Sequence, residues 1–353
     1  MGSADELTRR VKELAGQAGF ARVGIAAAGA VDDGGRFRRW VGRGMHASMG
    51  YLARNVEKRL RPDRLVDGAR SVICLAAGYA PGEGDPNGEP GLARYARGRD
   101  YHKVLKRRCR ALIGRLRRLE ATFEGRAFVD SAPLLERGLA RAAGIGWIGR
   151  NRCLTVAGLG SYVFLCEIVS NLPLTPDRPS AEGCDGCGAC VAACPTGALG
   201  EAGLDARRCV SYLTVEHAGA IDAELWPRMG RRLIGCDACQ EACPHNRGAP
   251  PGDPELRAGE APLGGASLAD VLEWSEPDWD LATRGSAARR ASWAMMLRNA
   301  VIAAGNSAGR DDAPALQTAL KRLRARRPEL AGAIDWAIDR LSADTRGVQC
   351  FAR

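Results

Sequence analysis

The chain has 353 residues, enough for two or three domains with sizeable cores, and its 46% hydrophobic content is ordinary for a globular protein. No apolar stretch reaches the roughly 18 residues that a membrane span needs, and the charged N-terminal segment has neither a secretory apolar region nor a twin-arginine leader, so we expect a cytoplasmic protein. The formal net charge of +10 favours an anionic partner, although a solvated basic surface explains the charge equally well.

The first half of the chain alternates helical and apolar, β-rich segments, which is the pattern of an α/β domain over residues 1–180. The N-terminal segment predicts an amphipathic helix. Four apolar runs predict strands at 21–29, 71–80, 126–130 and 161–169. Residues 101–122 predict a helix with one apolar face and an otherwise strongly basic surface. The Pro- and Gly-rich segment 81–91 predicts a loop.

The second half is organised around cysteines and then around helices. Residues 181–245 hold the cysteine runs in short, loop-rich segments, and the Pro/Gly-rich stretch 246–266 predicts a linker. From residue 268 onward the pattern is helical. The segments 286–306 and 312–343 predict stacked helical hairpins of the HEAT-like kind.

The two cysteine runs predict iron–sulfur clusters. CDGCGACVAACP, beginning at Cys184, has the C-x2-C-x2-C-x3-C-P spacing of bacterial ferredoxins, whose fourth cysteine binds the other cluster. The first predicted 4Fe–4S site therefore comprises Cys184, Cys187, Cys190 and Cys243. The second run, CDACQEACP at 236–244, is one cysteine short, and Cys209 supplies it across the inserted segment 210–235. The second predicted 4Fe–4S site comprises Cys194, Cys209, Cys236 and Cys239.

Zinc is the alternative occupant, since it also accepts four thiolates from C-x2-C pairs. Zinc sites seldom use a triple run followed by x3-C-P, so we favour two clusters that act as an electron wire. Four isolated cysteines lie in apolar or helical segments and are interpreted as core residues: Cys74, Cys109, Cys153 and Cys166.

Asp130 is the first candidate catalytic residue, because it ends a predicted strand where α/β folds bind their ligands. If apolar residues surround it, its pKa should rise, which suits a general acid. A structural role explains Asp130 equally well, since it could cap the helix that begins near Leu134. Nearby, Asp100-Tyr101-His102 is similar to the D-x-H-x-x-G signature of corrinoid mutases. Because Leu105 replaces the glycine, we interpret His102 as a pocket-wall or substrate-contacting residue rather than a cobalt ligand.

Several stretches together resemble the epoxyqueuosine reductase family. They are GMHASMGYL, YARGRDYHKVLKRR, VDSAPLLERGLARAAGIGWIGRN, the two cysteine runs, CVSYLTVEHAG and RNAVIAAGN, and the resemblance runs from about residue 10 to 306. It implies an α+β or α/β, nitroreductase-like, cobalamin-binding catalytic domain at 1–180. A double 4Fe–4S ferredoxin-like domain would follow at 181–250, and a helical, HEAT-like, tRNA-binding domain at 267–345.

The resemblance also implies a reaction, the reduction of epoxyqueuosine to queuosine at the wobble position of tRNA, the last step of queuosine biosynthesis. Cobalamin would bind base-off with no protein ligand to cobalt, and the nearer cluster would reduce it to cob(I)alamin, a strong nucleophile. Two electrons and two protons would then remove the epoxide oxygen as water. Asp130 matches the family's proton donor. Residues that match the polar pocket around it are Asp100, Tyr101, His102 and Arg137. Residues that match corrin contacts are Ala53, Ala93, Asp130, Leu154, Ser211, Cys236, Asp237, Ala238 and Cys239.

The implied partners fit the charge. A modified base must be splayed out of its loop to reach a buried cobalt, and the phosphates of the anticodon stem need a basic surface. That surface is expected on the 103–118 helix, Arg289, Arg290, Arg298 and the 321–327 segment. A flavodoxin or ferredoxin would supply electrons, and the chain would act as a monomer without a membrane. Two alternatives are a corrinoid-dependent enzyme like the reductive dehalogenases, which usually carry a twin-arginine leader, and a 4Fe–4S electron carrier, which leaves the large first domain unexplained.

Overall fold

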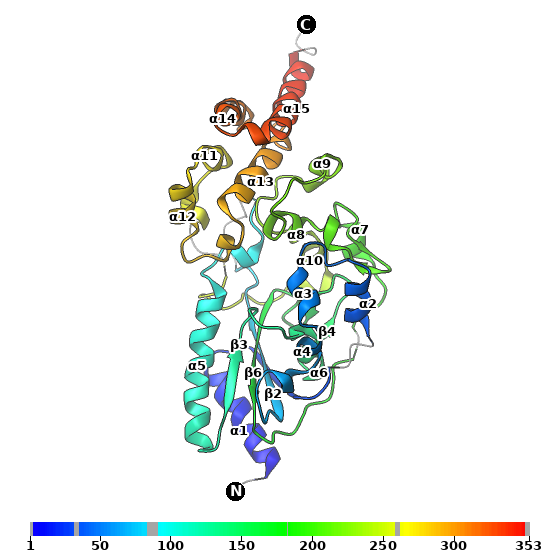
Figure 1. Cartoon of the computed structure of the whole chain (residues 1–353), viewed down its shortest axis with the longest axis vertical. Helices are drawn as coiled ribbons and strands as arrows, with labels where there is room; N and C mark the ends of the chain where they lie inside the picture. Colours follow the sequence, from blue (N-terminus) through cyan, green and yellow to red (C-terminus); the bar gives the residue numbers. More distant parts are fainter. Residues whose placement is uncertain (1–2, 32–34, 83–90, 182, 258–261, 350–353) are drawn as a thin grey trace.

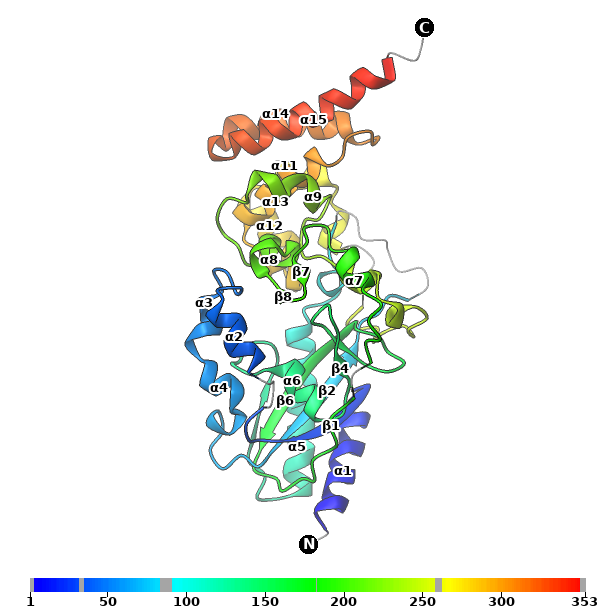
Figure 2. The same ribbon diagram turned by 90° about the vertical axis from the view of Figure 1, so that its right-hand side faces the viewer.

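The computed structural model describes residues 3–31, 35–82, 91–181, 183–257 and 262–349. The molecule is elongated, with the sheet and the N-terminus toward one end and the last helices toward the other (Figures 1 and 2). The cysteine-rich segment lies between them. In the described part of the chain, no helix is long and apolar enough to cross a membrane.

A four-stranded sheet forms the centre of the N-terminal part. Its order is β1 (Arg22–Ala27), β2 (Ser71–Gly78), β6 (Val163–Ser170) and β3 (Gly125–Phe128). All three pairings between these strands are antiparallel. The four predicted strands are therefore present, but the α/β pattern does not produce a parallel sheet, and the fold is of the α+β kind. The expectation that Asp130 lies at the ligand-binding edge of a parallel sheet is wrong for the same reason.

Burial on both faces explains why the strands read as continuous apolar runs. Helices α1 (Ala4–Gln17) and α5 (Tyr101–Leu119) cover one face, where Ile73 and Leu75 point into their core. Helix α6 (Glu136–Ala142) covers the other face, against Val72 and Cys74. Strands that are covered on both sides need no alternation of polar and apolar residues. Such continuous apolar strands are more typical of parallel sheets.

Shorter elements complete the N-terminal part. They are α2 (Arg36–Gly42), α3 (Gly50–Arg54), α4 (Val56–Leu60), η1 (Pro62–Arg64), η2 (Arg94–Ala96), β4 (Trp147–Ile148) and β5 (Leu154–Thr155). Of the predicted loop 81–91, residues 83–90 lie outside the described residues. The cysteine-rich segment consists of short pieces: α7 (Ala189–Ala192), β7 (Leu199–Gly200), β8 (Gly203–Leu204), η3 (Ala206–Arg208), α8 (Val210–Val215), η4 (Ala223–Leu225), α9 (Trp226–Met229), α10 (Ala238–Glu241) and η5 (Pro244–Asn246).

The predicted linker packs against the first domain over its described residues. The backbone N–H groups of Gly252 and Asp253 donate to the carbonyl oxygens of Ala80 and Gly78, both at 2.9 Å. Arg108 of α5 holds the same segment through an ion pair with Asp253 at 2.5 Å. This part of the linker is therefore attached rather than free, and residues 258–261 lie outside the described residues.

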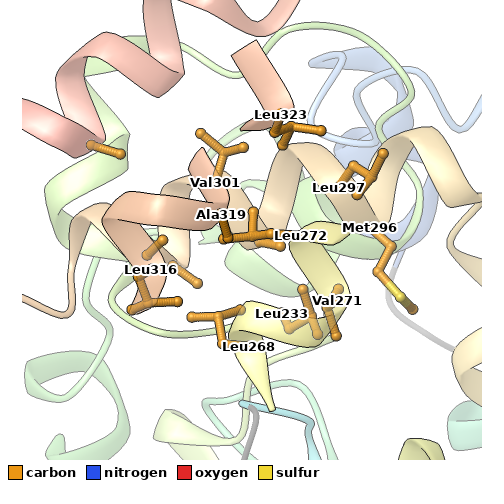
Figure 3. Packing of buried hydrophobic residues seen from close by; sticks show 14 of the residues in the cluster. Leu233, Leu268, Val271, Leu272, Met296, Leu297, Val301, Leu316, Ala319 and Leu323 are labelled. Atoms are coloured by element: carbon orange, nitrogen blue, oxygen red, sulfur yellow. The ribbon is translucent and has the colours of Figure 1, made fainter. Parts of the chain in front are cut away.

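The C-terminal part is helical, as predicted. Its elements are η6 (Pro262–Gly265), α11 (Leu268–Glu273), α12 (Glu276–Thr283), η7 (Ala287–Arg290), α13 (Trp293–Gly305), α14 (Ala313–Arg326), η8 (Pro328–Leu330) and α15 (Ala331–Gln349). Helix α13 begins later than predicted because the Ser292 hydroxyl caps it, accepting the backbone N–H of Met295 at 3.3 Å. Leu233, from the cysteine-rich segment, joins Val271, Leu297 and Val301 in one core (Figure 3). The helical and cysteine-rich parts are thus packed together.

Candidate active site and cysteine sites

Asp130 follows β3 in a backbone conformation that few residues adopt. Its φ is +53°, in the left-handed region where aspartate is more frequent than most other residues. The backbone N–H of Asp130 donates to Glu136 Oε1 at 2.8 Å. The side chain is 56% exposed. Contact with the start of α6 therefore accompanies an unusual backbone and leaves the carboxylate free to reach outward.

The first turn of α5 supplies the partners of the Asp130 carboxylate. The Tyr101 hydroxyl donates to Asp130 Oδ2 at 2.7 Å, and His102 Nε2 lies 3.4 Å from the same oxygen. Asp100 caps α5 by accepting the backbone N–H of His102 at 3.0 Å, and its Oδ1 lies 2.8 Å from His102 Nδ1. Four of the five predicted catalytic residues thus come together at one point. Both ring nitrogens of His102 have carboxylate partners, so neither is left over for cobalt.

Arg137, the fifth predicted catalytic residue, faces away from this network. Its guanidinium donates to the carbonyl oxygen of Arg152, which ties α6 to the turn before β5. The positive charge of Arg137 lowers the pKa of Glu136. Glu136 in turn accepts the backbone N–H of Asp130. The structure therefore places Arg137 beside the site without a contact to Asp130.

The protonation of the site differs from the expectation for Asp130. Hydrogen bonds from His102 and Tyr101 hold the pKa of the Asp130 carboxyl below its usual range, although burial opposes them. The prediction of a raised pKa is wrong because polar donors, rather than apolar side chains, surround the carboxylate. Burial lowers the pKa of His102, but hydrogen bonds with Asp130 and Asp100 outweigh it, so the pKa is raised.

Glu136 carries the raised carboxyl pKa that was expected of Asp130. Burial, together with the negative charge of Asp130, raises the pKa of Glu136 to about 7. Nothing in the sequence marked this residue, since Glu at the start of a helix is commonplace. Its importance comes from the turn at residues 131–135, which brings it back to the Asp130 backbone.

Four cysteines of the first predicted cluster site line one cavity of about 150 Å³: Cys184, Cys187, Cys190 and Cys243. Cys184 and Cys187 are exposed, and Cys190 is buried. Arg150, Asn151 and His245 line the same cavity. The first set of thiols is therefore assembled from both cysteine runs, and it opens to the surface.

The second predicted set also gathers. The thiol of Cys209 interacts electrostatically with those of Cys236 and Cys239, and Cys239 does so with Cys194. Cys239 also interacts with Cys190 of the first set, so the two sets are neighbours. Cys209, although distant in sequence, is therefore within electrostatic range of two other members of its predicted set.

Backbone amides point at several of these sulfur atoms. Those of Ser211 and Tyr212 hydrogen-bond to the Cys209 sulfur, and that of Ala238 to the Cys236 sulfur. Such bonds stabilise thiolates and are a feature of iron–sulfur sites. Among the described residues, no group of three His, Cys, Asp or Glu side chains surrounds a point closely enough to hold a single metal ion.

Cys153 is a ninth cysteine at these sites, although the sequence suggested a core residue. Its thiol interacts with that of Cys239, which lowers the pKa of Cys153 and raises that of Cys239. It follows Arg152, whose carbonyl accepts the Arg137 guanidinium. The other three isolated cysteines are buried in the sheet core, as predicted: Cys74, Cys109 and Cys166.

The predicted corrin contacts divide into two groups. Ala93, Cys236 and Asp237 line one cavity of about 270 Å³, together with Arg97 and Arg232. Asp237 is 6% exposed and accepts the backbone N–H of Arg94 at 2.7 Å. This cavity therefore joins the segment before α5 to the second cysteine set.

The remaining predicted contacts lie elsewhere. Ala53 is exposed on α3, and Ala238 is half-buried at the start of α10. The Leu154 side chain is 3% exposed and packs in the sheet core, so only its backbone is available to a ligand. Ser211 directs its backbone toward Cys209 rather than toward the Ala93 cavity.

The residues predicted to contact RNA have differing surroundings. Arg298 is 6% exposed and donates to the carbonyl oxygens of Leu213 and His217, each at 2.7 Å, so its predicted RNA contact is wrong. Arg290 remains exposed and pairs with Glu216 at 2.7 Å. Several arginines of the 321–327 segment form exposed ion pairs, which are weak enough to exchange for phosphates.

Tyr51 is a further residue that sequence reasoning missed. Its ring is 37% exposed, and its hydroxyl interacts electrostatically with Glu216, Arg290 and Asp130. The segment GMHASMGYL was singled out, but nothing in it distinguished this residue. The Tyr51 hydroxyl is therefore within electrostatic range of both the Glu216–Arg290 pair and Asp130.

Comparison with known proteins gives a consistent result. The family model described as "Epoxyqueuosine reductase QueG, DUF1730" matches residues 59–131, and that of a "4Fe-4S double cluster binding domain" matches residues 183–246. A curated epoxyqueuosine reductase of Pseudomonas aeruginosa is 40% identical over 348 residues, which is 95% of this chain and 94% of the relative.

Solved structures are similar over nearly the whole chain. An epoxyqueuosine reductase with an epoxyqueuosine-modified tRNA-Tyr stem loop has a TM-score of 0.85 at 28% identity, covering 96% of this chain and 91% of that one. The Bacillus subtilis epoxyqueuosine reductase, in a structure with its catalytic loop swung out of the active site, has a TM-score of 0.79 at 26% identity, covering 96% and 100%.

Proposed function

The chain belongs to the epoxyqueuosine reductase family, and from that premise we propose that it reduces epoxyqueuosine to queuosine at the wobble position of tRNA, the last step of queuosine biosynthesis. One observation carries the proposal beyond family membership. Tyr95, a partly buried residue of η2, interacts electrostatically with both Asp130 and Asp237. Asp237 lies between the thiols of Cys236 and Cys239 in the chain. The proton-handling carboxylate and the predicted electron-carrying site are therefore both within electrostatic range of one tyrosine, an arrangement that suits a reductive deoxygenation.

The cysteine sets suit two 4Fe–4S clusters. Each set offers four thiols, those of the first set from the two runs and those of the second from the two runs and Cys209, with backbone amides directed at sulfur, which is the donor chemistry of a cubane. The exposed thiols of the first set make it the entry point for electrons from an external carrier, a flavodoxin or ferredoxin. The second set, beside Asp237, is the exit toward the substrate pocket.

The residues present also suit base-off cobalamin. The cavity lined by Ala93, Cys236 and Asp237 lies against the second cysteine set and can receive part of a corrinoid. His102 is engaged by two carboxylates, so no imidazole competes for the metal. When bound, cobalamin supplies the low-potential two-electron chemistry that the clusters feed.

The chain's own residues would handle protons. Removing an epoxide oxygen as water takes two electrons and two protons. The Asp130 carboxylate is exposed, and Tyr101 and His102 fix its direction. In the open site these donors favour its ionised form. Closing the site with substrate excludes water and raises a carboxyl pKa, which moves Asp130 toward the protonated form of a donor.

We further propose three domains for this chain: a nitroreductase-like, cobalamin-binding catalytic domain at 1–180, a double 4Fe–4S ferredoxin-like domain at 181–250, and a HEAT-like helical domain at 267–345. The anticodon stem-loop would lie across the last of these, with Tyr51 and Arg290 at the opening of the pocket.

The protein would work in the cytoplasm, where its tRNA substrate is, and as a monomer. Its loop at residues 129–135 would swing, as in the Bacillus subtilis relative.

The test is direct turnover. The protein is reconstituted anaerobically with iron and sulfide, loaded with cobalamin, reduced, and mixed with an anticodon stem-loop carrying epoxyqueuosine. Mass analysis of the nucleosides should then show queuosine. An Asp130→Asn variant should bind cobalamin with its base-off spectrum yet fall about 100-fold or more in rate, since a positioned general acid contributes about 10²–10⁴-fold. No queuosine from the wild-type chain would refute the function, and unchanged Asp130→Asn turnover would refute the role of Asp130.

A further inference from the structure

Glu136 makes a contact that the proposed chemistry does not by itself require. It is the first residue of α6, and its Oε1 accepts the backbone N–H of Asp130 at 2.8 Å. The contact spans six residues and closes the turn between β3 and α6. A side chain that reaches back to a backbone amide in this way restrains the turn between them.

The Asp130 backbone needs such a restraint. Its φ of +53° lies in the left-handed region, which costs free energy for a residue other than glycine and persists only when neighbours hold it. Within the turn, Ser131 donates to the carbonyl of Val129 at 2.6 Å, and Leu134 donates to that of Ala132 at 2.8 Å. These bonds join residues of the turn to each other, so they would travel with it if it moved.

Glu136, in contrast, is attached to a fixed element. Helix α6 packs on the sheet through Leu139 and Ala140, which are 1% and 0% exposed. Tyr101 and His102, at the start of α5, are further anchors of Asp130 on another element. Asp130 is therefore held from two sides, at its backbone by α6 and at its carboxylate by α5.

We propose that Glu136 is a positioning residue that latches the loop 129–135, accepting the Asp130 backbone N–H so that the carboxylate faces the substrate. The inference rests on the proposed function, because it assigns Glu136 to the same reaction. It predicts that the acceptor oxygen of residue 136 matters and that its negative charge does not. A glutamine offers a carbonyl oxygen at nearly the same place, whereas an alanine offers none.

The test compares three variants of the cluster- and cobalamin-loaded enzyme. Glu136→Gln should keep kcat within about twofold of wild type. Glu136→Ala should lower kcat about tenfold or more, the loss expected for one hydrogen bond from an otherwise strained backbone, while the KM for the stem-loop stays similar. Glu276→Ala is the matched control, because Glu276 is also the first residue of a helix, α12, and is exposed. It should behave as wild type.

Amide hydrogen exchange supplies a readout that does not depend on turnover. In the loaded enzyme, the peptide covering residues 129–135 should exchange faster in Glu136→Ala than in wild type or Glu136→Gln. If Glu136→Ala fails to fold, Glu136→Asp replaces it, since the shorter side chain withdraws the acceptor and should give the same faster exchange. Equal exchange in all variants would overturn the latch, as would a loss in Glu136→Gln as large as in Glu136→Ala. Neither result would question queuosine formation by the wild-type chain.

Discussion

The Tyr101 hydroxyl donates to Asp130 Oδ2 at 2.7 Å, which joins the first turn of α5 to the residue that follows β3. The Tyr101 ring is itself fixed, because it stacks on Phe164 of β6 with centroids 4.1 Å apart. The donor is thus rigidly placed. It favours the ionised form of Asp130 and sets the direction of the carboxylate.

A Tyr101→Phe variant should therefore change the pH dependence of turnover. The ring and its stacking remain, but the hydrogen bond that lowers the Asp130 pKa is lost, so that pKa rises. If Asp130 donates a proton, the rate falls as pH rises through its pKa, and this limb of the profile should move to higher pH by up to about one unit. Single-turnover rates on the modified stem-loop between pH 5 and 9 measure it. If the fall in rate occurs at the same pH in Tyr101→Phe as in wild type, the ionisation of Asp130 does not cause the pH dependence.

Cys209 is predicted to complete the second cluster, and a Cys209→Ala variant tests that assignment. The reconstituted wild-type protein should hold about eight irons, four for each cubane, and the variant about half of them. Cys74→Ala is the matched control, since Cys74 is 1% exposed in the sheet core and belongs to neither set. Full iron content in Cys209→Ala, combined with a loss in Cys153→Ala, would transfer the role to Cys153, its neighbour across Cys239.

If Cys209 is the ligand, Cys153 has a different effect. Cys239, once bound to iron, is a thiolate and can only accept a hydrogen bond, so the Cys153 thiol beside it becomes the donor. Donors to a ligand sulfur stabilise the reduced, more negative cluster. Cys153→Ala should therefore keep its iron but lower the potential of one cluster by about tens of millivolts. Redox titration followed by electron paramagnetic resonance measures this, with Cys109→Ala as the control. Unchanged potentials would mean that Cys153 only fills space.

The sequence predicted where the helices and strands lie better than it predicted how the strands pair in the sheet. The strands at 71–80 and 161–169 are found as β2 and β6, and the basic helix at 101–122 as α5. Apolar periodicity reports burial, so it located these elements. It could not distinguish antiparallel from parallel pairing, because helices cover both faces and remove the alternation that would mark the difference.

Among the site residues, those that belong to a motif of fixed spacing could be predicted from the sequence. Those whose partners lie far away along the chain could not. Cys209 could be proposed as a ligand by counting, because a ferredoxin run has a fixed number of thiolates. Cys153 and Glu136 could not, since their partners lie far along the chain or across a turn whose conformation no motif specifies. The Asp130 pKa was mispredicted for the same reason. Its direction depends on donors from α5, which the residues next to Asp130 in the sequence do not reveal.

The last prediction concerns stability and pH. The Glu136 pKa is raised from an ordinary 4.5 to about 7, so the unfolded chain ionises this carboxyl at lower pH than the folded protein does. Between about pH 4.5 and 7 the folded state therefore holds more protons, and the free energy of unfolding contributed by Glu136 falls as pH rises. The loss should be on the order of 2 kcal/mol, because the group is only partly buried.

Other charged and titratable groups face Glu136, so a difference between two proteins is the proper measurement. They are Asp130, Arg137, His102, Tyr101, Arg59, Glu167, Cys74 and Cys166. Burial also raises the pKa of Glu167, which acts in the same direction. Subtracting Glu136→Gln, which cannot titrate, removes most of these contributions. The melting temperature of wild type relative to Glu136→Gln should be higher at pH 5 than at pH 8. An equal difference in melting temperature at the two pH values would mean that Glu136 titrates at its ordinary pKa. Its carboxyl group would then be more exposed to solvent than the structure shows.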